Sequence, residues 1–315
     1  MPSERSATLS EPTNDPVPAP AAYLIGHDPT GATDVRVEHI CDLTAEDYGR
    51  YKAADRTLYD VLVANIFTYV QGSVKVFQTI WQSANAALAA NEIRPNTDPH
   101  GMAVWNTQLR ASVLSLCMSI VHHQEQTYQT VCDRHGANGQ AHQDAKAVFG
   151  NLYDNHRGYR YLYGLRNVMV HDNMDAVSIE ASAARATTGQ PIAVYDLYID
   201  RSLMTESTKL NRNLRNEFAT LEEDPSVLEL LAEVAQPLVD ANRSLRDIVH
   251  PDLTEACKTI IEFDDLFEQR PGTRALVHEQ SPELVAGFRF SYTSIAADVI
   301  GFSRAYKPGR PSDDN

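Results

Sequence analysis

A helical pattern of apolar residues in the middle of the chain constrains its fold more than any other feature. Most members of this pattern recur three or four residues apart, the spacing of one face of an α-helix: Met102, Trp105, Leu109, Val113, Leu116, Ile120, Thr127 and Val131. Asp98 and Pro99 supply a side-chain cap and a first-turn proline, while Gly136 and Gly139 stop the pattern. The sequence therefore predicts one long helix here.

Two further segments have the same spacing and are joined to this helix by short linkers. The first begins at Thr44, ends near Arg94 and Pro95, and has apolar positions at Leu58, Leu62, Ile66, Tyr69, Phe77, Ile80, Trp81 and Leu88. The second begins near His142 and carries Ala145, Val148, Leu152, Tyr159, Leu162 and Met169. Because the connections are short, we expect helices around 57–90, 102–135 and 141–170 to pack as one antiparallel bundle.

The other segments surround this bundle. We expect a disordered leader at 1–20, a short β-like or irregular segment at 21–43, a helical core at 44–172, a β-hairpin insertion at 173–205, a helical region at 206–306 and a loose tail at 307–315. Within the insertion, residues 176–182 and 192–199 should pair through a turn at 187–191. Residues 284–292 partly alternate, which is typical of a strand. The predicted fold class is mainly α, with a small antiparallel addition and extra C-terminal helices.

The composition limits the partners and the compartment. The chain has 27 basic and 42 acidic residues, a net charge of −15, and such a surface repels a phosphate backbone wherever no local site guides it. No stretch reaches the ~18 apolar residues of a membrane span, and the N-terminal residues lack the apolar run of a secretory signal. The four cysteines lie far apart, which is typical of reduced thiols. We therefore expect a soluble cytoplasmic protein without a membrane partner.

The ten residues from Gly164 to Asn173 hold the most informative polar pattern. Arg166 continues the core-facing positions of the third helix, where a guanidinium needs a partner because an unpaired buried charge is costly. His171 follows at the expected helix end. Together the two side chains would supply a fixed cation and a group that exchanges protons near neutral pH.

Arg166 and Asn167, followed by three residues and His171, resemble the motif of the HEPN superfamily. These are all-α domains of prokaryotic toxins, abortive-infection factors and CRISPR-associated nucleases, and the resemblance covers residues 57–172. It implies a metal-independent endoribonuclease without a cofactor, which works as a homodimer with the two motifs facing one cleft. It also implies a 2′,3′-cyclic phosphate and a 5′-hydroxyl as products. A toxin with an antitoxin partner, or a component of phage defence, is the implied setting.

The residue types suit that chemistry. His171 would be the general base or acid, Arg166 would hold the scissile phosphate, and Asn167 would orient the histidine or the phosphate. The same side chains also allow a structural interpretation, in which Arg166 and His171 satisfy carbonyl groups at the helix end. The alternative hypothesis is therefore a non-catalytic HEPN-like protein that uses this region to dimerise or to bind a partner.

The surroundings of the motif favour RNA. Residues 101–171 carry six basic and four acidic side chains, in contrast to the acidic chain as a whole. The helix before the motif interleaves aromatic and cationic residues, so we predict RNA contacts from His156, Arg157, Arg160 and Tyr163. The alternative is that the tyrosines pack at the edge of the core and the arginines extend into solvent.

A metal site is not predicted. His122 and His123 are adjacent, and adjacent residues of a helix diverge by about 100°, so the two imidazoles cannot chelate one ion. His122 and Glu125 share a face of the helix, but no further ligands accompany them.

Overall fold

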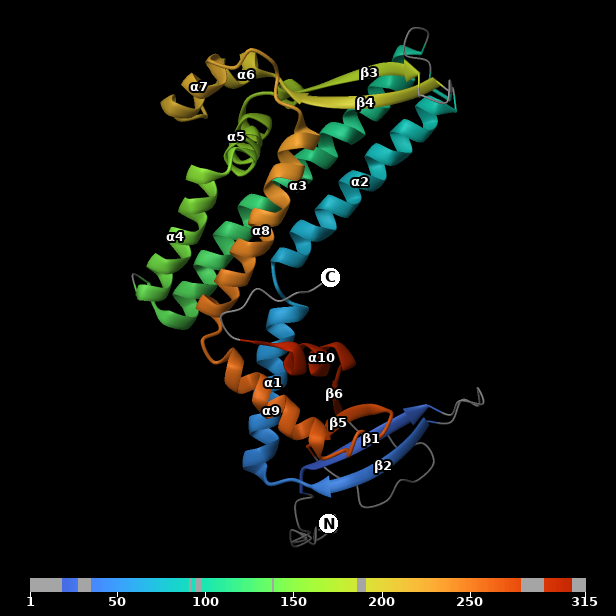
Figure 1. The fold of residues 1–315 in the computed structure, drawn as a ribbon, viewed down its shortest axis with the longest axis vertical. Helices are drawn as coiled ribbons and strands as arrows, with labels where there is room; N and C mark the ends of the chain where they lie inside the picture. The colour runs from blue at the N-terminus through green and yellow to red at the C-terminus, as the bar shows by residue number, and fades with distance from the viewer. Residues whose placement is uncertain are drawn as a thin grey trace, which may run out of the picture. The chain divides into compact units, whose positions relative to one another are not determined.

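The computed structural model (Figure 1) describes residues 19–27, 35–90, 92–93, 98–137, 139–185, 191–278 and 292–307. Most of these residues are helical, so the predicted mainly α fold class is confirmed. They form two compact units, one from residues 1–62 and 252–315 and the other from residues 63–251. The predicted leader and tail lie almost entirely outside the described residues. None of the helices in the described part of the chain combines the length and the apolar character that a bilayer span requires.

The unit of residues 63–251 is a helical bundle. Its long helices are α2 (Phe67–Ala89), α3 (Pro99–His135), α4 (Gln140–Asn155), α5 (Arg157–His171) and α8 (Val227–Val249). Helix α3 is central and contacts the other four. Direction alternates from α2 to α3, to α4 and to α8, as expected of an antiparallel bundle, whereas α5 is seen nearly end-on (Figure 1). The predicted ends of α3 are confirmed: Asp98 accepts a hydrogen bond from the Gly101 N–H, and Gly136 adopts a φ of 85° just past the helix.

The first predicted helix is two helices that belong to different units. Helix α1 (Ala45–Leu62) ends before Asn65, whose side chain accepts a hydrogen bond from the Phe67 N–H at 2.9 Å and starts α2. The apolar residues continue at helical spacing across this turn by coincidence. Tyr69, which belongs to the predicted core-facing pattern, is in fact 65% exposed. The division of the chain therefore falls at residues 62 and 63, and not at the predicted start of the core at Thr44.

The third predicted helix is also interrupted. His156 has an extended backbone (φ −121°, ψ 104°) and separates α4 from α5. The side chain of Glu233, on α8, accepts a hydrogen bond from the Gly158 N–H at 3.1 Å, which satisfies a donor in the first turn of α5. The direction of a side chain on α5 therefore cannot be predicted by continuing the helical spacing of α4.

The predicted hairpin is present. Strands β3 (Val177–Arg185) and β4 (Pro191–Ile199) pair antiparallel, with Val177 opposite Ile199, while the turn residues 186–190 lie outside the described residues. Helix α2 holds β4, since the Trp81 Nε1–H donates to the Tyr195 carbonyl at 2.8 Å. Three short helices complete the unit: η1 (Met174–Ala176), α6 (Arg201–Glu206) and α7 (Arg212–Ala219).

The unit of residues 1–62 and 252–315 combines helices with an antiparallel sheet. The sheet order is β2 (Val35–Asp42), β1 (Ala21–His27), β5 (Thr273–Val277) and β6 (Tyr292–Ile295), and the helices are α1, α9 (Leu253–Asp265) and α10 (Ala297–Ala305). Buried Asp264 forms ion pairs with Arg274 and Arg304, at 2.7 and 2.6 Å, which join α9 to β5 and α10. The β-like segment at 21–43 is thus part of a sheet that also includes residues from the predicted C-terminal helical region. The strand predicted at 284–292 lies outside the described residues except for Tyr292.

Candidate functional site

The motif residues occupy the last two turns of α5. Arg166 and Asn167 are half-buried, and His171, the final residue of the helix, is exposed. The Arg166 Nη1–H donates to Asn167 Oδ1 at 3.0 Å, so the first two residues of the motif are directly coupled. Asp172 caps the end of the helix: its N–H donates to the Val168 carbonyl at 2.8 Å, and its carboxylate accepts a hydrogen bond from the Ser207 hydroxyl.

Arg166 and His171 leave α5 on different sides. Five residues separate them, which corresponds to about 140° around the helix axis. Arg166 lies against α3, where its Nε–H donates to Met118 Sδ at 3.2 Å. The His171 side chain makes no hydrogen bond with any described residue. One protomer alone therefore does not bring the two groups together at the pocket that Arg166 lines.

The burial of Arg166 also differs from the core position expected of it. The apolar spacing that places Arg166 in the core runs through residue 156, where the helix is broken. Within α5 the buried side includes Leu162, Leu165 and Met169, and Arg166 lies at its edge. Its guanidinium is half-buried and does not need a buried counter-charge.

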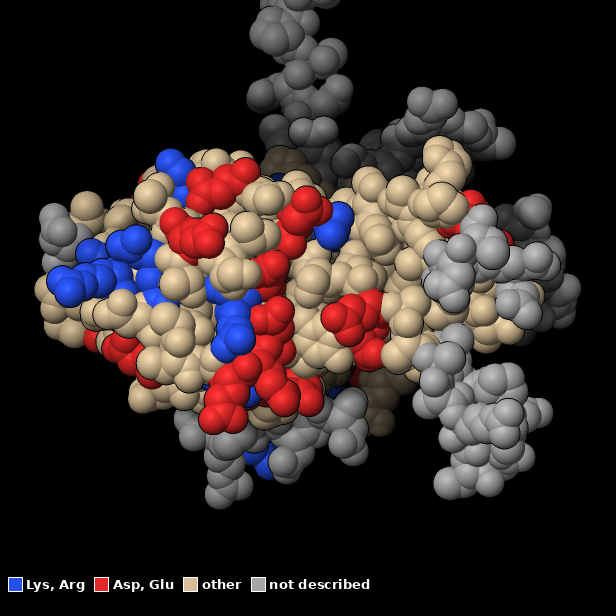
Figure 2. All heavy atoms as spheres, turned by 90° about the horizontal axis from the view of Figure 1, so that it is seen from above, with Lys and Arg blue, Asp and Glu red and all other residues tan. Residues whose placement is uncertain are grey.

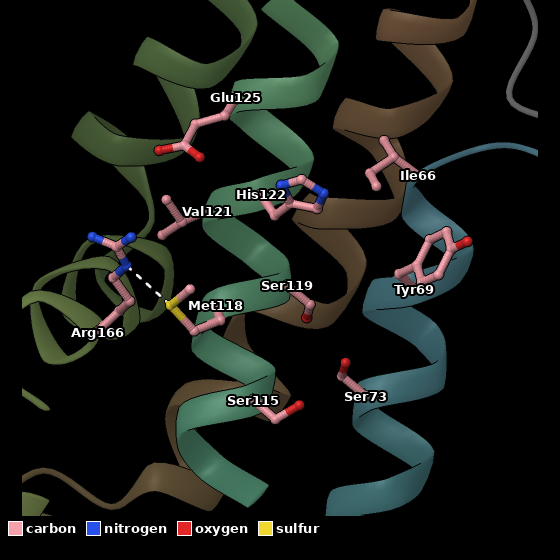
Figure 3. Close-up of a pocket in the computed structure, with 10 residues that line it drawn as sticks. All are labelled: Ile66, Tyr69, Ser73, Ser115, Met118, Ser119, Val121, His122, Glu125 and Arg166. Atoms are coloured by element: carbon pink, nitrogen blue, oxygen red, sulfur yellow. Dashed lines mark hydrogen bonds between the residues drawn. The ribbon is translucent and has the colours of Figure 1, made fainter. Parts of the chain in front are cut away.

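Arg166 lines an open pocket of about 330 Å³ between α2, α3 and α5 (Figure 3). The pocket is lined by Ile66, Tyr69, Ser73, Ser115, Met118, Ser119, Val121, His122, Glu125 and Arg166. Figure 3 shows Glu125 and Arg166 on one side of α3, with His122 directed toward the groove between α3 and α2. His122 and Glu125 are both exposed and share a helix face, as their spacing predicts.

The polar groups of this pocket are available to a ligand. Among the described residues, no carboxylate forms an ion pair with Arg166, and neither His122 nor Glu125 makes a hydrogen bond or an ion pair. The pocket thus presents a cation, an imidazole and a carboxylate together. The sequence indicates that His122 and Glu125 share a face, but only the packing of α5 on α3 brings Arg166 to the same pocket.

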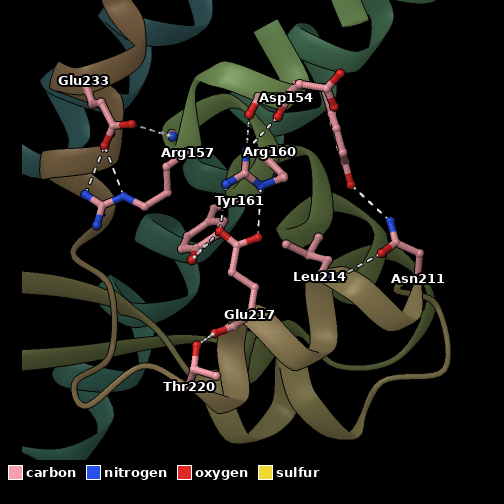
Figure 4. Close-up of polar contacts among 11 residues, drawn as sticks. Asp154, Arg157, Arg160, Tyr161, Asn211, Leu214, Glu217, Thr220 and Glu233 are labelled. Atoms are coloured by element: carbon pink, nitrogen blue, oxygen red, sulfur yellow. Dashed lines mark hydrogen bonds and ion pairs between the residues drawn. The ribbon is translucent and has the colours of Figure 1, made fainter. Parts of the chain in front are cut away.

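Arg160, predicted to contact RNA, is engaged inside the unit (Figure 4). Its Nε–H and Nη2–H donate to the two carboxylate oxygens of Glu217, on α7, at 3.0 and 2.7 Å. Its Nη1 group donates to the carbonyls of Tyr153 and Asp154 at 2.7 and 3.2 Å. A phosphate could reach this guanidinium only by displacing these partners.

The other three predicted RNA contacts also have local roles. Arg157 forms an ion pair with Glu233 at 3.0 Å, which joins α5 to α8. The Tyr163 ring packs edge-on against Tyr153, with ring centroids 6.0 Å apart. His156 is the half-buried residue between α4 and α5. The packing of Tyr163 agrees with the packing alternative, whereas Arg157 and Arg160 form ion pairs within the unit and do not simply extend into solvent.

Other basic side chains gather elsewhere on this unit. Figure 2 shows Lys and Arg side chains together over the α6–α7 end, beside a band of acidic side chains. This end includes Lys209 and Arg212, both exposed and without an ion pair to any described residue. Basic side chains are therefore gathered locally on a chain whose net charge is negative.

Residues that could hold a metal do not cluster. In the part of the chain that the structure describes, no three His, Cys, Asp or Glu side chains are arranged to bind one ion.

Comparisons with known proteins do not assign the chain to a family. No protein-family model matches the sequence, and no curated protein or solved structure is significantly similar to it. The resemblance to the HEPN superfamily rests on the motif of Arg166, Asn167 and His171 and on the preceding helices.

Proposed function

We propose that this protein is a metal-independent endoribonuclease of the HEPN type. The observation that carries the proposal is the state of Arg166, which is half-buried, hydrogen-bonded to the motif's own Asn167, and open to a pocket without a carboxylate partner among the described residues. A partly desolvated guanidinium with unused donors is suited to binding a phosphate through two parallel hydrogen bonds.

The proposed reaction is an internal transfer at phosphorus. The ribose 2′-oxygen loses its proton and attacks the phosphorus, the bond from phosphorus to the 5′-oxygen breaks, and the 5′-oxygen gains a proton. His171 transfers one of these protons, and Arg166 stabilises the charge that develops on the phosphate. Asn167 fixes the guanidinium through the 3.0 Å hydrogen bond. The products are a 2′,3′-cyclic phosphate and a 5′-hydroxyl.

A homodimer is part of this proposal. Because Arg166 and His171 diverge by about 140° on one helix, the His171 that acts at a given Arg166 is supplied by a second copy. Exposed apolar side chains surround the pocket and motif and would be buried in such a contact: Tyr69, Met118 and Val170 are 65%, 38% and 42% exposed. An active enzyme of this kind would act in the cytoplasm as a toxin restrained by an antitoxin, or in phage defence.

The test is cleavage of a mixed RNA pool by the purified chain, with analysis of the ends produced. Cleavage that persists in excess chelator and leaves cyclic phosphates is expected of the wild type. His171→Ala should abolish it, and Arg166→Lys should keep the fold but lose most activity, since lysine lacks the planar fork. A wild-type protein that never cuts RNA would refute the proposal.

A second candidate function is non-catalytic dimerisation or partner binding through the same region. The exposed apolar side chains and the internal ion pairs of Arg157 and Arg160 favour it. In that case His171→Ala would weaken self-association or partner binding, and no preparation would cut RNA.

A further inference from the structure

The four cysteines of the chain lie in different surroundings. Cys117 and Cys257 are buried in the cores of the two units. Cys41, on β2, is half-buried, and burial together with an adjacent carboxylate raises the pKa of its thiol. Cys132, in the last turn of α3, is also half-buried, but its surroundings are different: its Sγ lies 3.2 Å from Nδ1 of His142.

We propose that Cys132 is a nucleophilic thiol that exchanges with small-molecule disulfides, and that His142 accepts the thiol proton. The nucleophile in such an exchange is the thiolate and not the thiol. A neutral imidazole at hydrogen-bonding distance can remove the proton and hold it beside the reacting sulfur. Neither Cys41 nor Cys117 has a hydrogen-bonding imidazole among the described residues. This modification site is independent of the proposed cleavage of RNA.

The packing of α4 on α3 fixes the imidazole beside the sulfur. His142 lies in the first turn of α4, which follows α3 after a short turn (Figure 1). Tyr128 precedes Cys132 by four residues on the same face of α3, and its ring packs against the imidazole with ring centroids 5.7 Å apart. The Tyr128 hydroxyl accepts a hydrogen bond from the Gln124 side chain at 3.0 Å. The proton acceptor is therefore in place before a disulfide arrives.

The other nitrogen of the ring is open to solvent exchange. His142 is half-buried, and no described residue forms an ion pair with it or a hydrogen bond with its Nε2. Besides the thiol, Tyr128 is the titratable side chain that packs on this ring in the described part of the chain. The imidazole is thus neither neutralised by a carboxylate nor committed to a second partner, and it can both take up and release a proton.

The exchange balances in protons and electrons. The Cys132 proton passes to His142 Nδ1, and the Cys132 sulfur bonds to one sulfur of the disulfide as the bond between its two sulfurs breaks. The departing thiolate takes up a proton from the imidazolium. The protein thiol is oxidised to a mixed disulfide, and half of the small disulfide is reduced to a free thiol. The adduct also removes the hydrogen bond that links the end of α3 to the start of α4.

The experiment follows the reaction of the purified, reduced chain with glutathione disulfide, and peptide mass spectrometry locates the adducts. At pH 7, Cys132 of the wild type should react at least ~10-fold faster than Cys41. His142→Gln should slow the reaction of Cys132 at least ~10-fold, because glutamine is polar but accepts no proton. His100→Gln changes an exposed histidine of α3 and is the matched control, so it should leave the rate unchanged. Cys117 should stay unmodified in every variant, which shows that the core remains folded.

The same rates at pH 10 separate proton transfer from a purely structural role. An ordinary thiol ionises without a base at this pH, so His142→Gln should there react within ~3-fold of the wild type. A deficit as large at pH 10 as at pH 7, or no deficit at pH 7, would overturn the assignment of His142 as the proton acceptor.

The wild-type chain tests the site without any substitution. If Cys132 and Cys41 react equally fast at pH 7, Cys132 is not an activated nucleophile and the proposal fails. This result would leave the proposed cleavage of RNA unaffected.

Discussion

The guanidinium of Arg160 and the carboxylate of Glu217 meet through two hydrogen bonds of 3.0 and 2.7 Å, and this pair joins α5 to α7. The Tyr161 hydroxyl donates to the same carboxylate at 3.1 Å. The two charged side chains are 19% and 33% exposed, so water only partly screens their attraction. Arg166, two turns further along α5, lacks such a partner among the described residues. One helix thus contains an arginine that holds the fold together and another that is open to a ligand.

The first prediction concerns the stability that this pair provides. Glu217→Gln should lower the free energy of unfolding by about 1–3 kcal/mol, because it leaves Arg160 half-buried without its counter-charge. Hydrogen bonding from Arg160 lowers the pKa of Glu217, so its contribution is complete above the ordinary value of 4.5 and is lost as the pH falls through the lowered pKa. Urea unfolding at neutral pH and at pH 3 measures both effects.

A matched surface pair provides the control. Glu255 and Lys258 are 74% and 68% exposed, so Glu255→Gln should change stability by less than about 0.5 kcal/mol. An effect of Glu217→Gln as small as that of Glu255→Gln would contradict the structural role of the Arg160 pair.

The second prediction concerns His123. Burial lowers the pKa of His123 to about 4, although a hydrogen bond with Asn242 acts in the opposite direction. The unfolded chain binds a proton at this histidine near pH 6.5 and the folded chain does not, so stability should decrease as the pH falls from 6.5 toward 4. The loss attributable to this side chain is about 3 kcal/mol at its largest.

Thermal unfolding across this pH range tests the prediction. His123→Gln should reduce the slope of stability against pH, even if it lowers stability at pH 7. His100→Gln, at an exposed position of the same helix, should leave the slope unchanged. Equal slopes for wild type and His123→Gln would show that the buried imidazole does not cause the pH dependence.

Local sequence signals predict the individual helices and strands well. Asp98, Pro99 and Gly136 act at the ends of α3 as their chemistry predicts, and the paired strands of the hairpin are recognisable from their residues. The turn before α2 and the break at His156 are missed, because apolar residues continue at helical intervals across both. A pattern of spacing does not reveal where the backbone changes direction.

Contacts between distant segments could not be predicted. Strand β1 pairs with β5, with Ala21 opposite Val277, and no local pattern links strands so far apart in the chain. The same limit applies to the candidate site. The motif identifies Arg166, and helical spacing places His122 and Glu125 on one face, but their meeting depends on how α5 packs against α3.

The third prediction concerns the charge of the pocket. Glu125 lies on the same side of α3 as Arg166 and would repel a bound phosphate (Figure 3). Glu125→Gln should therefore tighten binding of uridine 3′-phosphate by about fivefold, or ~1 kcal/mol, and Arg166→Gln should weaken it at least ~10-fold. Isothermal titration calorimetry at low salt measures both changes.

Glu229→Gln is the matched control, because Glu229 is an exposed carboxylate on α8 that does not line the pocket. It should leave the affinity unchanged. Weaker binding by Glu125→Gln would mean that this carboxylate contacts the ligand directly, as an acceptor for a hydroxyl group.

The last prediction concerns self-association through the apolar side chains around the motif. Val170 follows Arg166 by one turn and is 42% exposed, and Met118 contacts Arg166 directly. If this surface is the contact between two copies, Val170→Glu introduces a charge that the contact must desolvate, so the dimer dissociation constant should rise at least ~10-fold. RNA cleavage should fall in parallel, because His171 then lacks a second copy. Tyr59→Glu, at a 47% exposed position of α1, should change neither property. Sedimentation velocity over a range of concentrations measures the association, and a wild-type chain that stays monomeric throughout would refute the dimer.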